Sequence, residues 1–425
     1  MKTDNYRKRI IDAKVEEYLD TFGAVCIEGP KWCGKTWTSA HHCRSSIYLG
    51  DPANNFQNRR LAELAPQVIL EGDTPRLIDE WQEYPPLWDA VRHHVDQSGC
   101  PGQFILTGSA TPTHKGIMHS GAGRIARIRM RPMSLYESGD STGQVSLQDV
   151  CNARVSPQLT GEVELQYIIQ LIIRGGWPAA LQRKPHRAHL LPAEYLRAVL
   201  ADDVYRLDGI QRNASKMLLL LRSLARNVAT TVSLNKLRDD IKTESGEEID
   251  NKTITSYLDV FQRLFLLENL PPFATNIRSS VRVKQAEKRH FTDPSLACSL
   301  LRVTPEMLLN DLNTLGFLFE SLCVRDLQIY ADAFGAKVYH YQDYQGREID
   351  AVLELPDGNW CAFEIKLGAR QIDQAAANLC KLRTSIAGEP GGKPPIVLAV
   401  ICALSNAAYQ REDGVFVLPI TALKP

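Results

Sequence analysis

The chain has 425 residues, of which 44% are apolar and 23% charged, and its 49 basic side chains balance 49 acidic ones. This length predicts two to four domains, and the composition is ordinary for a soluble globular protein. A formal net charge of zero means that any affinity for nucleic acid must come from a local basic surface.

The chain shows no run of about 18 apolar residues, so no membrane span and no membrane partner are expected. Ten cysteines are present, and none forms a C-x-x-C pair. Free thiols in apolar runs fit a reducing compartment. The first residues are polar and lack the apolar core of a signal peptide, so we expect a cytoplasmic protein.

The first part of the chain alternates helical and apolar segments. A helix is predicted over residues 1–22, with Gly23 ending it. Short continuous apolar runs at 24–27, 77–78 and 104–106 are typical of buried parallel strands. Strands that alternate with helices predict a three-layer α/β domain over residues 1–138.

Directly after the first predicted strand, residues 29–36 fit the pattern G-x-x-x-x-G-K-[ST], and a predicted helix follows. Glycines let backbone N–H groups curl around a phosphate, Lys35 can reach the β- and γ-phosphates, and the Thr36 hydroxyl can ligate Mg²⁺. The predicted nucleotide-binding residues are Gly29, Pro30, Lys31, Trp32, Cys33, Gly34, Lys35 and Thr36. The expected cofactors are ATP and Mg²⁺.

A second pair of polar residues supports this site. Asp79 and Glu80 end the second apolar run, where a carboxylate can hold the Mg²⁺ shell and a neighbouring one can polarise the attacking water. Thr107 and Ser109 end the third run, either as sensors that orient the water or as a simple turn.

Residues 139–229 are predicted to be a linker followed by helices. Residues 230–294 have the pattern of a winged helix, with Ser233 and Thr253 as helix caps. A basic cluster near its hairpin predicts sequence-independent contact with DNA phosphates, or packing against a protein partner or a second copy. Its members are Arg278, Arg282, Lys284, Lys288 and Arg289.

Residues 312–425 are again predicted to be α/β, with a hairpin around the turn at 356–359. Period-two alternation places Glu364 and Lys366 on one strand face. A strict four-residue loop would put Asp350 opposite Ile365, so an odd loop or a bulge is needed to bring it to the same face. With Glu320 on the preceding helix, this constellation resembles the PD-(D/E)XK nuclease core. The resemblance implies that Glu320, Asp350 and Glu364 bind metal and that the catalytic Lys366 orients water. Charged pairs on an ordinary solvated strand face give the same pattern.

Over nearly its whole length, the sequence resembles bacterial and archaeal AAA-type ATPases with a carboxy-terminal domain of uncharacterised function. The matching motifs are residues 29–36, 79–80, 105–109, 123–124, 131–135, 175–178, 251–259 and 346–350. The resemblance implies an additional-strand (ASCE-type) P-loop fold, in which another strand separates the strands that precede residues 29 and 79. It also implies a catalytic arginine at the γ-phosphate, in cis or across a subunit interface. Arg124 is the first candidate, and Arg127, Arg129 and Arg131 are alternatives.

The sequence thus predicts an ATPase that couples Mg-ATP turnover to a DNA-directed effector, which is either a nuclease or a binding module without activity. In the second case the protein is a nucleotide-dependent switch or scaffold. A small-molecule kinase fits less well, because Glu80 beside Asp79 suits attack by water.

Overall fold

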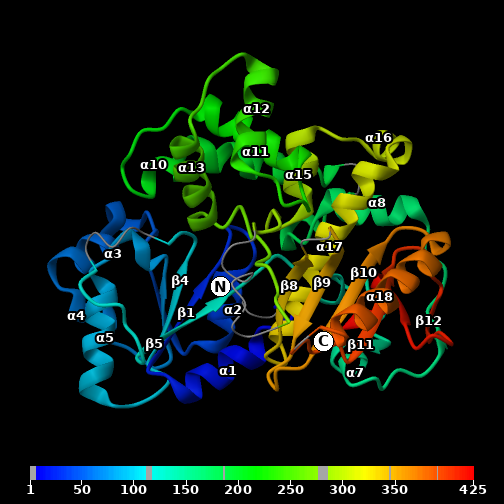
Figure 1. Cartoon of the computed structure of the whole chain (residues 1–425). Coiled ribbons are helices and arrows are strands. Elements are labelled where there is room, and N and C mark those ends of the chain that lie inside the picture. Colours follow the sequence, from blue (N-terminus) through cyan, green and yellow to red (C-terminus); the bar gives the residue numbers. More distant parts are fainter. Residues whose placement is uncertain (1–5, 112–116, 185–186, 276–285, 344–345, 390) are drawn as a thin grey trace. The chain divides into compact units, whose positions relative to one another are not determined.

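The computed structural model describes residues 6–111, 117–184, 187–275, 286–343, 346–389 and 391–425. The chain forms two compact units (Figure 1). Unit 1 comprises Met1–Pro132, Ala201–Arg212 and Asp259–Leu266, and unit 2 comprises Met133–Leu200, Asn213–Leu258 and Leu267–Pro425. Within the described residues, no helix is long and apolar enough to cross a membrane.

Unit 1 is built on a five-stranded parallel sheet with the order β2-β3-β4-β1-β5. The strands are β1 (Ala24–Glu28), β2 (Ser45–Tyr48), β3 (Arg76–Asp79), β4 (Phe104–Gly108) and β5 (Ile125–Arg129). Ile105 of β4 pairs with Val25 on one side and with Leu77 on the other. Strand β4 therefore separates β1 from β3, which confirms the predicted strand order.

Helices cover both faces of this sheet, as the three-layer prediction requires. They are α1 (Asp12–Thr21), α2 (Lys35–His42), α3 (Ala53–Leu64), α4 (Pro66–Leu70) and α5 (Leu87–Ser98), and unit 1 also contains the short α10 (Val204–Arg206). Val25 of β1 packs in one core cluster with Val15 of α1. Its neighbour Cys26 packs in another with Trp88 of α5. The predicted first helix is too long, because α1 begins only at Asp12.

Unit 2 contains a seven-stranded sheet with the order β7-β12-β13-β11-β10-β9-β8, and a pair β14-β6. The strands are β6 (Val145–Ser146), β7 (Gln158–Leu159), β8 (Lys337–Gln342), β9 (Glu348–Glu354), β10 (Trp360–Lys366), β11 (Val397–Cys402), β12 (Ala407–Gln410), β13 (Phe416–Pro419) and β14 (Leu423–Lys424). Strands β8, β9 and β10 are antiparallel neighbours, and β11 runs parallel to β10.

The helices of unit 2 are α6 (Leu135–Ser138), α7 (Leu147–Cys151), α8 (Leu165–Arg174), α9 (Leu190–Ala198), α11 (Ala214–Arg226), α12 (Leu234–Ser245), α15 (Pro294–Leu301), α16 (Pro305–Asn310), α17 (Leu312–Asp332) and α18 (Ile372–Ala387). Helix α13 (Asn251–Arg263) continues from unit 2 into unit 1. Helix α18 packs Leu379 into a core with Ala362 and Val400 of the sheet.

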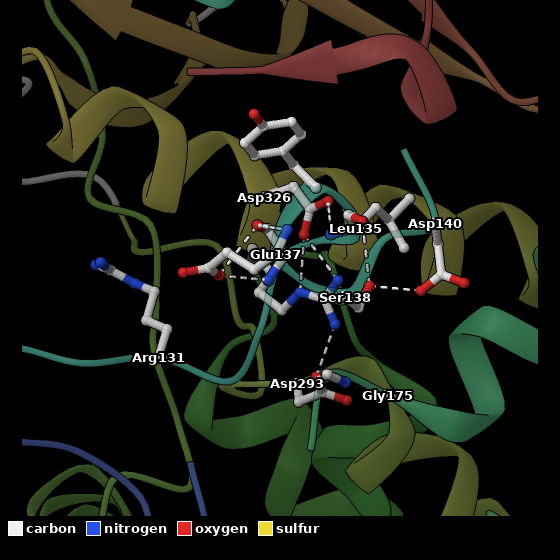
Figure 2. Close-up of polar contacts among 12 residues, drawn as sticks. Arg131, Leu135, Glu137, Ser138, Asp140, Gly175, Asp293 and Asp326 are labelled. Carbon is white, nitrogen blue, oxygen red and sulfur yellow. Dashed lines mark hydrogen bonds and ion pairs between the residues drawn. The ribbon is translucent and has the colours of Figure 1, made fainter. Parts of the chain in front are cut away.

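Asp293, Asp326 and Leu135 of unit 2 belong to one buried network of polar contacts (Figure 2). Arg325 of α17 donates to Asp293 Oδ2 at 2.8 Å and to Asp326 Oδ1 at 2.7 Å. The other oxygen of Asp326 accepts from the backbone N–H of Leu135 at 2.9 Å. Asp293 also accepts from the N–H of Gly176 at 2.9 Å. The motifs at 131–135 and 175–178 are thus tied to α17 by buried charge-assisted hydrogen bonds.

The predicted caps of the 230–294 segment have different outcomes. Ser233 caps α12, since its Oγ accepts from the N–H of Lys236 at 3.2 Å. The prediction for Thr253 is wrong, because Asp250 accepts from the Thr253 N–H at 2.6 Å and α13 already begins at Asn251. Arg278, Arg282 and Lys284 lie outside the described residues.

Candidate functional site

The loop from β1 to α2 places its glycines where another residue would not fit. Gly34 has φ 109°, in the left-handed region that favours glycine. A Cβ on Gly29 would lie 2.1 Å from the carbonyl oxygen of Met130. Lys35 begins α2, and its ammonium donates to the carbonyls of Gly29 at 2.9 Å and Pro30 at 2.8 Å. The loop therefore curls around the end of the Lys35 side chain.

Asp79 lies at the carboxyl end of β3, beside this loop. Its Oδ1 accepts from Thr107 Oγ1 at 2.7 Å, and the Thr36 hydroxyl lies near enough to the same carboxylate to affect its pKa. Burial raises the pKa of Asp79, and the hydroxyls of Thr107 and Thr36 act against that rise. The structure therefore joins three residues that the sequence places in separate motifs.

Glu80 has a left-handed backbone, with φ 57° and ψ 49°. Its N–H donates to Thr107 Oγ1 at 3.0 Å, and its Oε2 accepts from Ser109 Oγ at 2.9 Å. The side-chain amide of Gln82 donates to the same Oε2 and to Ser109 Oγ. A strained backbone of this kind is a mark of functional sites. Gln82 was missed in the sequence, although its position two residues after Glu80 was the available signal.

This donor set fits a Mg²⁺-bound phosphate chain. Oxygen ligands from Asp79 and Thr36 are the type that Mg²⁺ prefers, and Lys35 supplies a cation at the start of an eight-residue helix. Lys31, also in the loop, forms an ion pair with Asp203 at 2.5 Å. Asp203 ends the π-helical turn Val199–Asp203, and nothing in the sequence near the motif indicates it.

The second candidate site lies on β9 and β10. Glu354 pairs with Trp360, so five residues form the loop, and Asp350 comes to the same side as Glu364. Lys366 Nζ lies 3.0 Å from Asp350 Oδ2 and 2.6 Å from Glu364 Oε2. The odd loop length that the sequence argument required is present.

Glu320, Asp350 and Glu364 form a cluster of buried carboxylates whose pKa values are shifted by burial and by one another. Burial, followed by repulsion from Asp350, raises the pKa of Glu320 and of Glu364 to about 8. Burial alone would also raise the pKa of Asp350, but the ammonium groups of Lys366 and Lys288 hold it below its usual value.

Lys288 does not lie on an exposed basic surface, and that prediction is corrected here. Its side chain is 2% exposed, and its Nζ lies 2.5 Å from Glu320 Oε1 and 3.8 Å from Asp350 Oδ1. Arg289 is also largely buried and pairs with Glu287 at 3.5 Å. Neither side chain is placed to form a phosphate-binding surface.

The predicted metal site at Glu320, Asp350 and Glu364 does not fit this arrangement. An ammonium group stands between Glu320 and Asp350, in the place where a shared cation would need to be. In the part of the chain that the structure describes, no group of three or more His, Cys, Asp or Glu side chains is arranged to hold a metal ion.

Three segments of the chain match models of known protein families. Residues 21–139 match the family model described as AAA domain. This part of the chain is therefore similar to AAA domains. Residues 165–307 and 315–423 match two domains of unknown function, DUF8612 and DUF4143.

Two curated relatives are uncharacterized proteins, Rv2008c of Mycobacterium tuberculosis and Mb2031c of Mycobacterium bovis. Each is 24% identical over 84% of this chain and 74% of its own length. Among solved structures, the Walker-type ATPase PABY2304 of Pyrococcus abyssi is 14% identical, with a TM-score of 0.42, over 71% of this chain and all of that one. AMPPCP-bound DnaA from Aquifex aeolicus is 12% identical, with a TM-score of 0.27, over 59% of this chain and 86% of that one.

Within the AAA domain, Arg124 does not reach the phosphate loop of its own chain. It precedes β5 at the amino ends of the parallel strands, whereas the loop follows their carboxyl ends. Its Nε donates to Asp96 at 2.7 Å. The predicted role in cis is therefore wrong. Arg127 stacks on Trp88 at 4.4 Å from the ring centroid, and Arg129 ends β5 on the side of the loop.

Proposed function

We propose that this chain is a Mg²⁺-dependent ATP hydrolase. The observation that carries the proposal is the hydrogen bond from Thr107 to Asp79, with Thr36 near the same carboxylate and the Lys35 ammonium at the phosphate loop. In P-loop ATPases, this combination of lysine, hydroxyl and carboxylate binds nucleotide phosphates.

Each residue has its own part in the proposed reaction. The AAA domain would hold Mg²⁺ through Thr36 and Asp79, and the bound ion would neutralise charge on the phosphates. Lys35 binds the β- and γ-phosphate oxygens. Glu80, fixed by Ser109 and Gln82, accepts a hydrogen bond from the attacking water and orients it. The Thr107 hydroxyl holds the Asp79 carboxylate and the Glu80 backbone in position through its two hydrogen bonds.

Phosphate release from ATP by the full-length protein, with and without Mg²⁺, tests this activity. Lys35→Ala removes the loop cation and is expected to abolish both nucleotide binding and turnover. If the protein instead transfers phosphate to an added small-molecule acceptor without releasing it to water, the chain is a kinase rather than a hydrolase.

We further propose that residues 312–425 form the effector core. The succession α17-β8-β9-β10-α18-β11, with three antiparallel strands and a fourth parallel one, supports a PD-(D/E)XK-like fold. Because the carboxylates do not fit a metal, the proposal is a partner-binding module that takes no divalent ion in this arrangement. The protein is then a nucleotide-dependent switch.

Phosphodiester hydrolysis is the second candidate function of this module. The observation that favours it is the convergence of Lys366 with Asp350 and Glu364. Mg²⁺- or Mn²⁺-dependent cleavage of DNA that is lost in Asp350→Ala would establish the nuclease. Absence of cleavage with ATP present would support the binding module.

A DNA-directed role is proposed on the order of elements in the middle of unit 2. Helices α11, α12 and α13 are followed by an extended segment that contains Arg289 and Phe291. Antiparallel bridges join Phe291 with Leu267, after α13, and Arg289 with Thr230, between α11 and α12, as in a winged helix. The proposed domain limits remain 1–138, 139–229, 230–294 and 312–425. Retention of the protein by double-stranded DNA that falls steeply with salt would support the role, and no retention at low salt would end it.

A further inference from the structure

Lys288 has an unusual environment for a lysine. Its side chain is 2% exposed, and its Nζ lies 2.5 Å from Glu320 Oε1, 3.5 Å from Glu348 Oε1 and 3.8 Å from Asp350 Oδ1. Lysine is almost never fully buried unless it is paired, and here three carboxylates surround one ammonium group. Two of these, Glu320 and Asp350, are themselves largely buried.

The backbone of Lys288 is held in place by an antiparallel bridge. Its N–H donates to the carbonyl of Leu270 at 3.0 Å, and its carbonyl accepts from the Leu270 N–H at 2.9 Å. The segment that contains Leu270 is joined in turn to β8, because the Phe273 N–H donates to the His340 carbonyl at 2.7 Å. The backbone that carries the Lys288 ammonium group is therefore hydrogen-bonded, through the Leu270 segment, to the sheet that contains Asp350.

Buried carboxylates require a compensating cation, and a divalent ion and an ammonium group compete for that role. An Mg²⁺ ion shared by Glu320 and Asp350 would lie about 2.0–2.1 Å from their oxygens. Lys288 Nζ already lies within 3.8 Å of both side chains. Lys366 neutralises the remaining pair, Asp350 and Glu364, from the other side. The cluster is therefore supplied with positive charge by the chain itself.

We propose that Lys288 is a built-in counterion that takes the place of a divalent metal at Glu320 and Asp350 and excludes the metal from the cluster. Removal of its charge converts the same carboxylates into a divalent-cation site. Any metal-dependent chemistry in this module then requires that Lys288 leave the cluster. The proposal is independent of ATP hydrolysis, and it explains why the module takes no metal in the function proposed above.

Binding of Mn²⁺ to the full-length, nucleotide-free protein tests the proposal. Free Mn²⁺ is measured by electron paramagnetic resonance in wild type, Asp350→Asn, Lys288→Met, Lys288→Ser and Lys288→Met/Asp350→Asn. Methionine keeps the length of the side chain without its charge, and serine leaves room for a hydrated ion. Arg289→Met is the matched control, because it changes the next residue of the same segment, whose ion pair is with Glu287. Folding of each variant is checked by circular dichroism.

We expect at least one of the single Lys288 variants to bind one additional Mn²⁺. Its affinity for this ion should be at least about tenfold higher than that of the wild-type cluster for any ion, a difference of about 1.4 kcal/mol in binding free energy. This ion is lost in the double variant and is not gained by Arg289→Met. Two results overturn the proposal. One is that wild type binds an ion that Asp350→Asn removes. The other is that both Lys288 variants fold and neither gains an ion. Neither result changes the ATPase proposal, which is tested by turnover.

Discussion

Thr107 Oγ1 donates a hydrogen bond to Asp79 Oδ1 across 2.7 Å. The same hydroxyl accepts from the N–H of Glu80 at 3.0 Å, so one buried side chain positions both acidic residues. This relationship gives the central strand β4 a direct role in the proposed chemistry, through the contact of Thr107 with both acidic residues.

Replacement of Thr107 by Val is the first test of this arrangement. Valine has the same shape but leaves the N–H of Glu80 without its partner, and an unsatisfied buried group costs about 1–3 kcal/mol. We expect kcat for ATP hydrolysis to fall by about tenfold or more, with a smaller change in nucleotide affinity. Thr107→Ser retains the hydroxyl and should stay close to wild type. Equal activity of the Val and Ser variants would remove Thr107 from the site.

Gly29→Ala tests the shape of the phosphate loop. The added Cβ would lie 2.1 Å from the carbonyl oxygen of Met130, so the loop or β5 must move. Overpacking of this kind costs about 1–3 kcal/mol, and we expect ATP affinity to fall at least about tenfold, measured by calorimetry. Gly50→Ala is the control, because its Cβ would meet nothing within 4 Å. Unchanged affinity in Gly29→Ala would contradict the loop assignment.

Asp203 is predicted to weaken nucleotide binding through its ion pair with Lys31. Asp203→Asn frees a positive charge in the phosphate loop, and we expect ATP to bind a few-fold more tightly, an effect that shrinks as salt screens the charge. Asp202→Asn, at the exposed neighbouring position, should change nothing. Affinity is compared at low and high ionic strength. Weaker binding in Asp203→Asn would reverse this interpretation and make the pair a positioning contact.

Arg325 is expected to be essential for the stability of unit 2. Arg325→Met leaves Asp293 and Asp326 buried without their cation, and such a loss costs about 3–5 kcal/mol. Arg197→Met removes an exposed pair with Glu194 and should change the free energy of unfolding by less than about 0.5 kcal/mol. Denaturant unfolding followed by circular dichroism compares the two. A similarly small decrease in the free energy of unfolding of both variants would show that the buried network does not stabilise unit 2.

The fold of unit 1 was predictable where apolar runs are continuous. Strands β1, β3 and β4 were expected for this reason, and the resemblance to AAA-type ATPases implied the strand order. Strand β2 was missed because Ser45–Tyr48 is short and half polar. Strand β5 carries arginines, and the sequence alone does not reveal that Arg127 stacks on Trp88.

The candidate sites were predictable only where their residues lie close in the sequence. Lys35, Asp79 and Glu80 each belong to a local pattern. Asp203 lies 172 residues beyond Lys31, and no local pattern connects them. Lys288 was placed in a basic patch because its neighbours in the sequence are basic, and its burial against Glu320 depends on tertiary packing. Charge in the sequence therefore predicted the wrong partner for this lysine.

The most direct test of the proposed hydrolase is to measure ATP binding and phosphate release by Glu80→Gln and to compare them with those of Lys35→Ala. Glutamine keeps the shape and the contact with Ser109 but cannot act as a carboxylate base, which typically contributes about 10²–10⁴-fold. We expect Glu80→Gln to bind ATP nearly as wild type and to release phosphate at least about 10²-fold more slowly, while Lys35→Ala does neither. Near-normal phosphate release by either variant would contradict the account.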